Sequence, residues 1–139
     1  MSDPYDLARF IAAQAPVYEA VRAELMAGRK QSHWMWFIFP QIAGLGTSPT
    51  AVRYAITSLA EAKAYLAHPI LGPRLRECVG LVLTVENRGA PQIFGSIDAV
   101  KLRSCLTLFE AAAPDEPAFG LALAKYFDGE RDPATLAKL

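Results

Sequence analysis

Apolar residues recur at helical spacing along most of this chain, and no segment alternates polar and apolar residues in the manner of a half-buried strand. The clearest stripe joins Leu102, Cys105, Leu106 and Phe109, which share one face of a helix. A chain without strand patterns can bury such stripes only against other helices. The spacing therefore predicts an all-α fold.

Capping residues, prolines and glycines divide the chain into segments of ordinary helix length. A capping side chain followed by proline, or by glutamate three residues later, indicates a helix start. Such starts are found at Asp3-Pro4, Ser48-Pro49, Ser58 with Glu61, and Asp132-Pro133. Helix ends are expected at Gly28, His68-Pro69 and Gly129. These marks predict six to eight helices.

Two connections between helices are also predicted. Residues 91–95 are expected to form a connector, and Asp98 is expected to cap the helix that follows it. Residues 111–117 are expected to form a loop before the next apolar stripe.

The chain has 139 residues, a normal size for one domain, and neither a repeat nor a shift in composition marks a boundary. Hydrophobic residues make up 53% of it, which excludes the composition of a disordered chain. We therefore predict one domain over residues 1–139, built as a compact orthogonal bundle of six to eight helices.

The charge balance and the hydropathy pattern restrict the partners. Because 14 basic residues balance 14 acidic ones, no global field attracts nucleic acid or anionic lipid, and we predict neither partner. The longest purely apolar run, residues 34–39, is far shorter than the roughly 20 residues of a membrane span. No signal-peptide pattern opens the chain, so we expect a soluble, cytoplasmic protein.

The two cysteines, Cys78 and Cys105, fall on apolar helical stripes, where a free cysteine behaves as a small hydrophobic residue. Their spacing does not match a zinc site. We therefore expect no disulfide, no metal site and no cofactor.

The segment from Ser32 to Gln41 contains both tryptophans and one of the two histidines. It is too short and too uniformly apolar for a periodicity argument, and a short buried helix or turn fits its neighbours better than a strand. His33 either bonds a backbone carbonyl beside the core or lies at the mouth of a pocket, where it could transfer protons. Trp34 either fills the core or stacks on a planar ligand at a pocket rim.

Asp98 and Lys101 offer chemistry at the polar start of a later helix. Asp98 could act as a general base, and Lys101 could bind a phosphate close to the helix N-terminus. If this helix start and the aromatic segment share one cleft, two groups of candidates follow. The catalytic candidates are His33 and Asp98, and the ligand-binding candidates are Ser32, Trp34, Gln41 and Lys101.

A family resemblance extends over nearly the whole chain. It rests on these segments: Asp6–Phe10, Gln14, Lys30–Gln41, Gly44–Gly46, His68–Gly72, Arg74-Leu75, Ile93–Gly95, Asp98, Lys101-Leu102 and Thr107–Phe109. Through them the chain resembles an uncharacterised bacterial family, domain of unknown function 1810. The resemblance implies a compact set of helices and supplies no established catalytic residues.

That family is often labelled calpastatin-like, which implies protease inhibition. The inhibitory segments of calpastatin are disordered and polar, whereas this chain has the apolar composition of a folded domain. The label therefore does not lead us to predict an inhibitor.

A second resemblance concerns Ile93-Phe94-Gly95, followed by Asp98 and Lys101. It is similar to an aromatic-glycine element before a polar helix in the superfamily that acts on NAD and ADP-ribose derivatives. The element of that superfamily is Trp-Gly, and Phe-Gly replaces it here. The resemblance implies a nucleotide-like or ADP-ribose-like ligand, with cleavage of a glycosidic bond as an activity.

We carry two main hypotheses forward. The first is a small-molecule-binding or hydrolytic domain for a nucleotide-like or ADP-ribose-like ligand. The second is a non-enzymatic helical module that presents an apolar patch to a protein partner or to a second copy of itself. A plain helical domain with neither property is the third reading.

Overall fold

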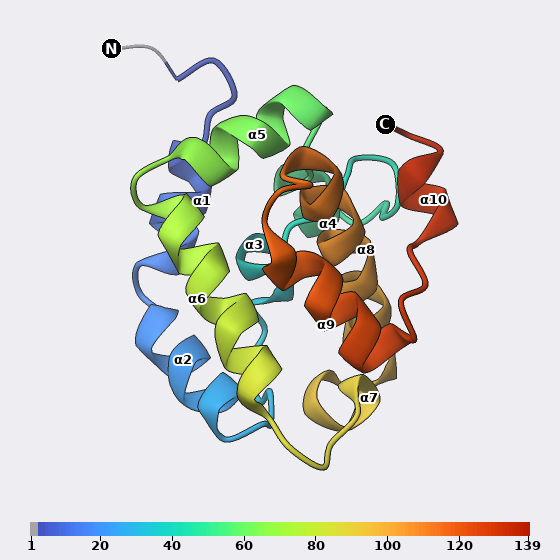
Figure 1. The fold of residues 1–139 in the computed structure, drawn as a ribbon. Coiled ribbons are helices and arrows are strands. Elements are labelled where there is room, and N and C mark those ends of the chain that lie inside the picture. Colours follow the sequence, from blue (N-terminus) through green and yellow to red (C-terminus); the bar gives the residue numbers. More distant parts are fainter. Residues whose placement is uncertain (1–2) are drawn as a thin grey trace.

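The computed structural model describes residues 3–139, which form an all-helical bundle (Figure 1). Its helices are α1 (Ala8–Gln14), α2 (Tyr18–Met26), α3 (Met35–Ile38), α4 (Pro49–Arg53), α5 (Leu59–Ala67), α6 (Leu71–Thr84), α7 (Ala90–Phe94), α8 (Ser96–Ala112), α9 (Pro117–Phe127) and α10 (Pro133–Leu136). The predicted all-α class is confirmed. The described helices number ten, more than the six to eight expected, because α7 forms where a connector is predicted and the four-residue α3 is too short to leave a periodic signal.

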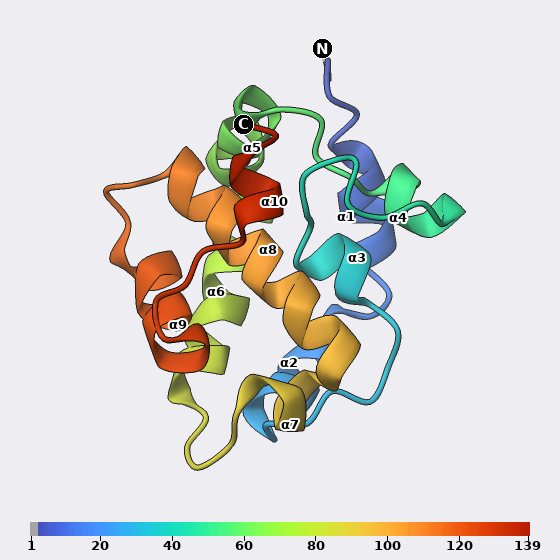
Figure 2. The same ribbon diagram turned by 90° about the vertical axis from the view of Figure 1, so that its right-hand side faces the viewer.

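Helix α8 is the centre of the bundle. It packs against α5, α7, α9 and α10, while α6 packs against α2, α5 and α9. Figure 2 shows α8 crossing the molecule diagonally, with α3 and α4 on one side of it and α9 on the other. This long helix therefore supplies side chains both to the core and to the face that carries α10.

The predicted caps form at three helix starts. The Ser48 hydroxyl accepts a hydrogen bond from the Ala51 amide at 3.2 Å, and the Ser58 hydroxyl accepts one from the Glu61 amide at 3.1 Å. At α10, Asp132 accepts one from the amide of Ala134 at 3.3 Å. Each side chain satisfies an amide that has no partner within its helix.

Two predicted connections differ from the structure. Residues 90–94 form helix α7 rather than a connector, and Asp98 does not cap α8. Helix α8 begins at Ser96, directly after Gly95, whose φ of +83° permits the sharp entry. Asp98 therefore lies inside the first turn, and its carboxylate pairs with two lysines instead. The predicted loop at 111–117 is shorter, because α8 continues to Ala112.

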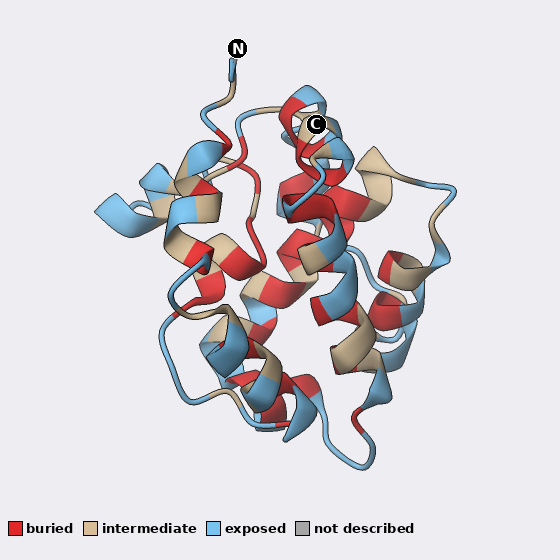
Figure 3. Cartoon of the chain, turned by 90° about the vertical axis from the view of Figure 1, so that its left-hand side faces the viewer, coloured by how far each residue is buried: buried red, intermediate tan, exposed pale blue. Residues whose placement is uncertain are grey.

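Aromatic side chains fill the core. The rings of Phe10, Tyr65, Phe109 and Phe119 contact one another in sequence, with centroid separations of 5.1, 5.4 and 6.0 Å. Figure 3 shows the buried positions on the inward sides of the helices. Both cysteines are buried and free, and burial raises the pKa of the Cys78 thiol to about 12. They are therefore packing residues rather than reactive thiols.

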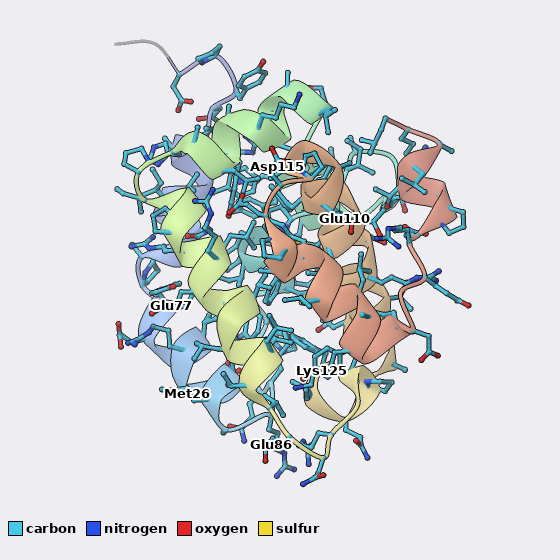
Figure 4. All side chains as sticks on the ribbon, in the orientation of Figure 1. Met26, Glu77, Glu86, Glu110, Asp115 and Lys125 are labelled. Atoms are coloured by element: carbon cyan, nitrogen blue, oxygen red, sulfur yellow. The ribbon has the colours of Figure 1, made fainter. Side chains whose placement is uncertain are left out.

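Polar contacts fasten the helix ends to one another. Lys125 of α9 donates to the Leu83 carbonyl at 2.7 Å and also to that of Val85, so it binds the last turn of α6. Glu110 of α8 forms a two-pronged ion pair with Arg131, at 2.6 Å for each contact, just before α10. Figure 4 shows Lys125 beside the end of α6 and Glu110 facing the α10 side.

None of the helices between residues 3 and 139 has the length and apolar character needed to cross a bilayer.

Candidate ligand-binding cleft

Residues of α8 and α10 line one side of a cleft, and residues of α3, α4 and their connecting segment line the other. Figure 2 shows how these helices are arranged. The volume of the cleft is about 710 Å³, within the range of roughly 300–1,000 Å³ that small-molecule sites occupy. The residues that line it are Trp36, Gln41–Gly46, Ala51, Val52, Tyr54, Ala55, Thr57, Ser96, Ile97, Val100, Lys101, Ser104, Asp132 and Ala134.

One wall of the cleft is made by two extended segments that meet side by side. Ile42 and Ile56 form a parallel bridge, in which the Ala43 amide donates to Ile56 and the Ile56 amide donates to Gln41, each at 2.8 Å. Both isoleucines are buried, so the bridge anchors this wall in the core. Gln41 and Thr57 lie at its ends and line the cleft.

Trp36 and Lys101 stand together at the cleft. Trp36 is half-buried, and the ammonium of Lys101 lies 4.6 Å from the centroid of its ring. Such a contact between a cation and a ring face contributes about 0.5–1 kcal/mol at a partly exposed site. The pair therefore presents a flat apolar surface and a positive charge to the same space.

The α8–α10 wall carries a hydrogen-bonded polar cluster. The hydroxyls of Ser104 and Thr135 donate to the Asp132 carboxylate at 2.7 and 2.6 Å, and the Asp132 amide donates to Thr107 at 2.9 Å. Burial alone would raise the pKa of Asp132, but the bonds from Thr135, Ser104 and the Ala134 amide outweigh it, and the pKa is lowered. An ionised carboxylate thus faces the cleft near neutral pH.

Exposed aliphatic side chains surround the cleft mouth. Val52, Ile97 and Val100 are 63%, 73% and 64% exposed, and all three line the cleft. The outer part of the cleft is therefore apolar, while its polar groups belong to Gln41, Thr57, Lys101 and the Asp132 cluster.

The structure brings some of the predicted site residues together. Gln41 and Lys101 line the cleft, and Asp98 contacts Lys101 at 3.4 Å without lining the cleft itself. Asp98 also pairs with Lys30 at 3.0 Å, so one carboxylate serves two ammonium groups. These three charges connect the chain just before the aromatic segment to the start of α8.

Ser32, His33 and Trp34 do not line this cleft. His33 is exposed, and the Ser32 hydroxyl donates to Glu24 of α2 at 2.8 Å. Trp34 is only 1% exposed, and its indole N–H donates to the same carboxylate at 3.0 Å. This geometry agrees with the interpretation in which Trp34 fills the core.

Trp36 is the principal cleft residue that the candidate set missed. Once this segment is known to be a helix, its spacing separates the two indoles, because residues 34, 35 and 38 share one face while residue 36 points elsewhere. In agreement, Trp34, Met35 and Ile38 are buried and Trp36 is half-buried. Asp132 was recognised only as a cap, and nothing in its local sequence indicates that it faces a cleft.

A second hollow, of about 550 Å³, lies over Arg9. The guanidinium of Arg9 pairs with buried Glu61 at 3.0 Å and donates to four backbone carbonyls, those of Tyr5, Asp6, Arg53 and Ala55. Because every N–H of the Arg9 guanidinium already has an acceptor, this side chain has no donor left for a ligand in the hollow. Nor do three or more His, Cys, Asp or Glu side chains gather into a metal-binding group within residues 3–139.

Comparison with known proteins places the fold among solved structures. The chain is 57% identical to the conserved hypothetical protein Rv1873 from Mycobacterium tuberculosis, with a TM-score of 0.97, over 99% of this chain and 98% of that one. No functionally curated protein matches the chain. The family described as "Protein of unknown function (DUF1810)" matches residues 4–139, and the chain belongs to that family.

Proposed function

We propose that this domain binds a small molecule with a planar ring, of the nucleoside or nucleotide type, in the cleft between α8, α10 and the α3–α4 segment. The observation that carries the proposal is the placement of the half-buried Trp36 ring and the Lys101 ammonium on one cleft of about 710 Å³.

The lining chemistry supports a ring-containing ligand. Stacking of a nucleobase on an aromatic side chain contributes about 1–3 kcal/mol, and Trp36 is the tryptophan available for it. The amide of Gln41 can donate to and accept from the edge of a base or a sugar. The hydroxyl of Thr57 donates its proton to Glu61 at 2.7 Å and can accept a hydrogen bond from the ligand. The aliphatic side chains at the mouth would cover the rest of the ligand and exclude water.

The proposal is for binding rather than hydrolysis. Neither histidine lines the cleft. The carboxylate of Asp132 is occupied by Ser104 and Thr135, and that of Asp98 is occupied by two lysines. These contacts give both carboxylates structural roles, Asp132 at the start of α10 and Asp98 between two lysines. The hydrogen bonds to Asp132 also lower its pKa, and with it the basicity that a general base needs.

A thermal-shift screen tests the proposal, with adenosine, AMP, NAD and ADP-ribose as ligands. Saturation at 100 times the dissociation constant adds about 2.7 kcal/mol to stability, which raises the melting temperature by several degrees. We expect a shift for wild type, a reduced shift for Trp36→Phe, and none for Trp36→Ala. No shift with any ligand, or equal shifts for wild type and Trp36→Ala, would contradict the proposal.

The exposed side chains of Val52, Ile97 and Val100 favour the second hypothesis, a surface for a protein partner or a second copy. Light scattering separates the two functions. A dimer that Ile97→Asp converts to monomer would favour the interaction module, whereas a monomer with ligand-dependent stability favours the small-molecule site.

A further inference from the structure

Two lysines share a single carboxylate beside the cleft. Asp98, in the first turn of α8, contacts Lys30 at 3.0 Å through one oxygen and Lys101 at 3.4 Å through the other. Within the part of the chain that the structure describes, no second acidic side chain lies within 4 Å of either ammonium. The three side chains together therefore hold one positive charge in excess, at the wall of the cleft.

The two lysines differ in their freedom to move. The side chain of Lys30 is 7% exposed, donates to the Ser32 carbonyl, and lies over the ring of Trp34 at 4.9 Å. The side chain of Lys101 is 24% exposed, has the longer contact to Asp98, and extends over Trp36. Lys30 is thus fixed by three interactions, and Lys101 is the lysine that can leave Asp98 without leaving the carboxylate unpaired.

We propose that the ligand carries one oxyanion group, a carboxylate or a phosphate, which takes Lys101 over from Asp98 while Lys30 keeps Asp98 paired. This inference rests on the proposed function, because the ring of the same ligand would lie against Trp36. The excess positive charge attracts an incoming anion. When Lys101 turns to that anion, Lys30 still pairs with Asp98, so the partly buried carboxylate is not left without a partner.

The same charges limit the ligand to one anionic group in this position. Lys101 is the only lysine or arginine that lines the cleft within residues 3–139, and the ionised Asp132 faces the same space. A second anionic group would be repelled by that carboxylate. Asp98 is in this view a positioning residue, since it holds Lys101 beside the ring without contacting the ligand.

Calorimetric titration with four probes tests the inference: adenosine, AMP, ADP and 2-naphthoate. We expect AMP to bind about tenfold more tightly than adenosine, because a charge-assisted contact is stronger than a neutral one. ADP should bind no more tightly than AMP. Tight binding of 2-naphthoate would identify an aromatic carboxylate as the source of the oxyanion, whereas tight binding of AMP alone would identify a phosphate.

The variant Lys101→Met should bind adenosine and AMP equally, since it keeps the apolar stem and removes the charge. Lys63→Met is the matched control, because Lys63 is exposed on α5 and does not line the cleft. Asp98→Asn should strengthen AMP binding several-fold, because it removes the competitor for Lys101. Circular dichroism melts of each variant verify that the fold is retained.

The outcomes separate this inference from the proposed function. If adenosine binds and AMP binds no better, the inference is wrong and the binding function stands. If Lys101→Met keeps the preference for AMP over adenosine, the inference is likewise wrong. If none of the four probes binds wild type, the proposed function fails and the inference fails with it.

Discussion

Trp34 and Trp36 are two residues apart, and each has a lysine over its ring, yet they belong to opposite sides of α3. Trp34 lies 1% exposed beneath Lys30, with its indole N–H bound to Glu24. Trp36 is half-buried beneath Lys101 and faces the cleft. Asp98 lies between the two lysines and joins both regions.

The difference shows how one short aromatic segment serves both stability and a surface site. On the sealed side every polar atom of the indole has a protein partner, which a buried group requires. On the cleft side the Lys101 ammonium lies over the ring of half-buried Trp36, and both side chains line the space proposed for the ligand. The predictions below test whether the two sides are as separate as this geometry indicates.

The largest effect is expected from Trp34→Ala. Removing a fully buried tryptophan leaves a cavity among Phe39 and Phe94, and such substitutions cost about 3–5 kcal/mol. Trp36→Ala should cost about 1 kcal/mol or less, because its ring lies at the surface of the cleft. Urea denaturation measures both values, and equal losses would remove the distinction between the two regions.

On the side of Trp34, Glu24→Gln should lower the free energy of unfolding by about 1–3 kcal/mol. The Glu24 carboxylate accepts hydrogen bonds from the Gln31 amide, from the Ser32 amide and hydroxyl, and from the Trp34 indole. Glu19→Gln is the matched control on α2, since its side chain is 85% exposed, and it should change stability little.

The same carboxylate predicts a pH dependence of stability. Burial would raise the pKa of Glu24, but the hydrogen bonds from Gln31, Ser32 and Trp34 lower it overall. A lowered folded-state pKa gives stability that is fully present above the unfolded-state pKa, about 4.3, and that is lost as the pH falls through the folded-state value. Wild type should therefore lose more stability than Glu24→Gln between pH 6 and pH 3, and parallel curves would contradict this role.

On the cleft side, Asp132→Ala should lower the free energy of unfolding by a smaller amount, about 1–2 kcal/mol. It removes the cap of α10, leaves the buried hydroxyl of Thr135 without its acceptor, and leaves that of Ser104 with the Val100 carbonyl alone. Thermal melts compare it with Asp115→Ala, which alters an exposed loop position. A melting temperature equal to that of the control would show that α10 is held by other contacts.

The smallest effect is expected in the tryptophan fluorescence of two variants that each keep one tryptophan. Trp36→Phe leaves only the buried indole, and Trp34→Phe leaves only the one at the cleft. Acrylamide should quench the fluorescence of the second protein more strongly, because the quencher needs contact with the ring. Equal quenching would place both indoles in the same environment.

Much of the fold could be predicted from the sequence, because local rules decide helices. The caps at Ser48, Ser58 and Asp132 each accept the amide that capping chemistry requires. The same reasoning was wrong at Asp98. Gly95 allows α8 to start earlier, so the carboxylate lies inside the helix and pairs with lysines.

Only some of the residues that line the cleft could be predicted from the sequence. The sequence makes Gln41 and Lys101 candidates, and both line the cleft. It also makes Trp34 a candidate, but Trp36 is the tryptophan that lines the cleft, because without a helical phase the two tryptophans are equivalent in the sequence. The four-residue helix α3 that sets this phase is too short for periodicity to reveal.

The sequence by itself determined that the chain is helical, where several helices begin, and that its aromatic segment is largely buried, because these properties depend on spacing and on nearby backbone groups. Only the tertiary structure decided which indole meets the cleft, and that Lys30 and Lys101 share Asp98. Such contacts join residues far apart in the chain, and they form only when the packing of whole helices brings those residues together.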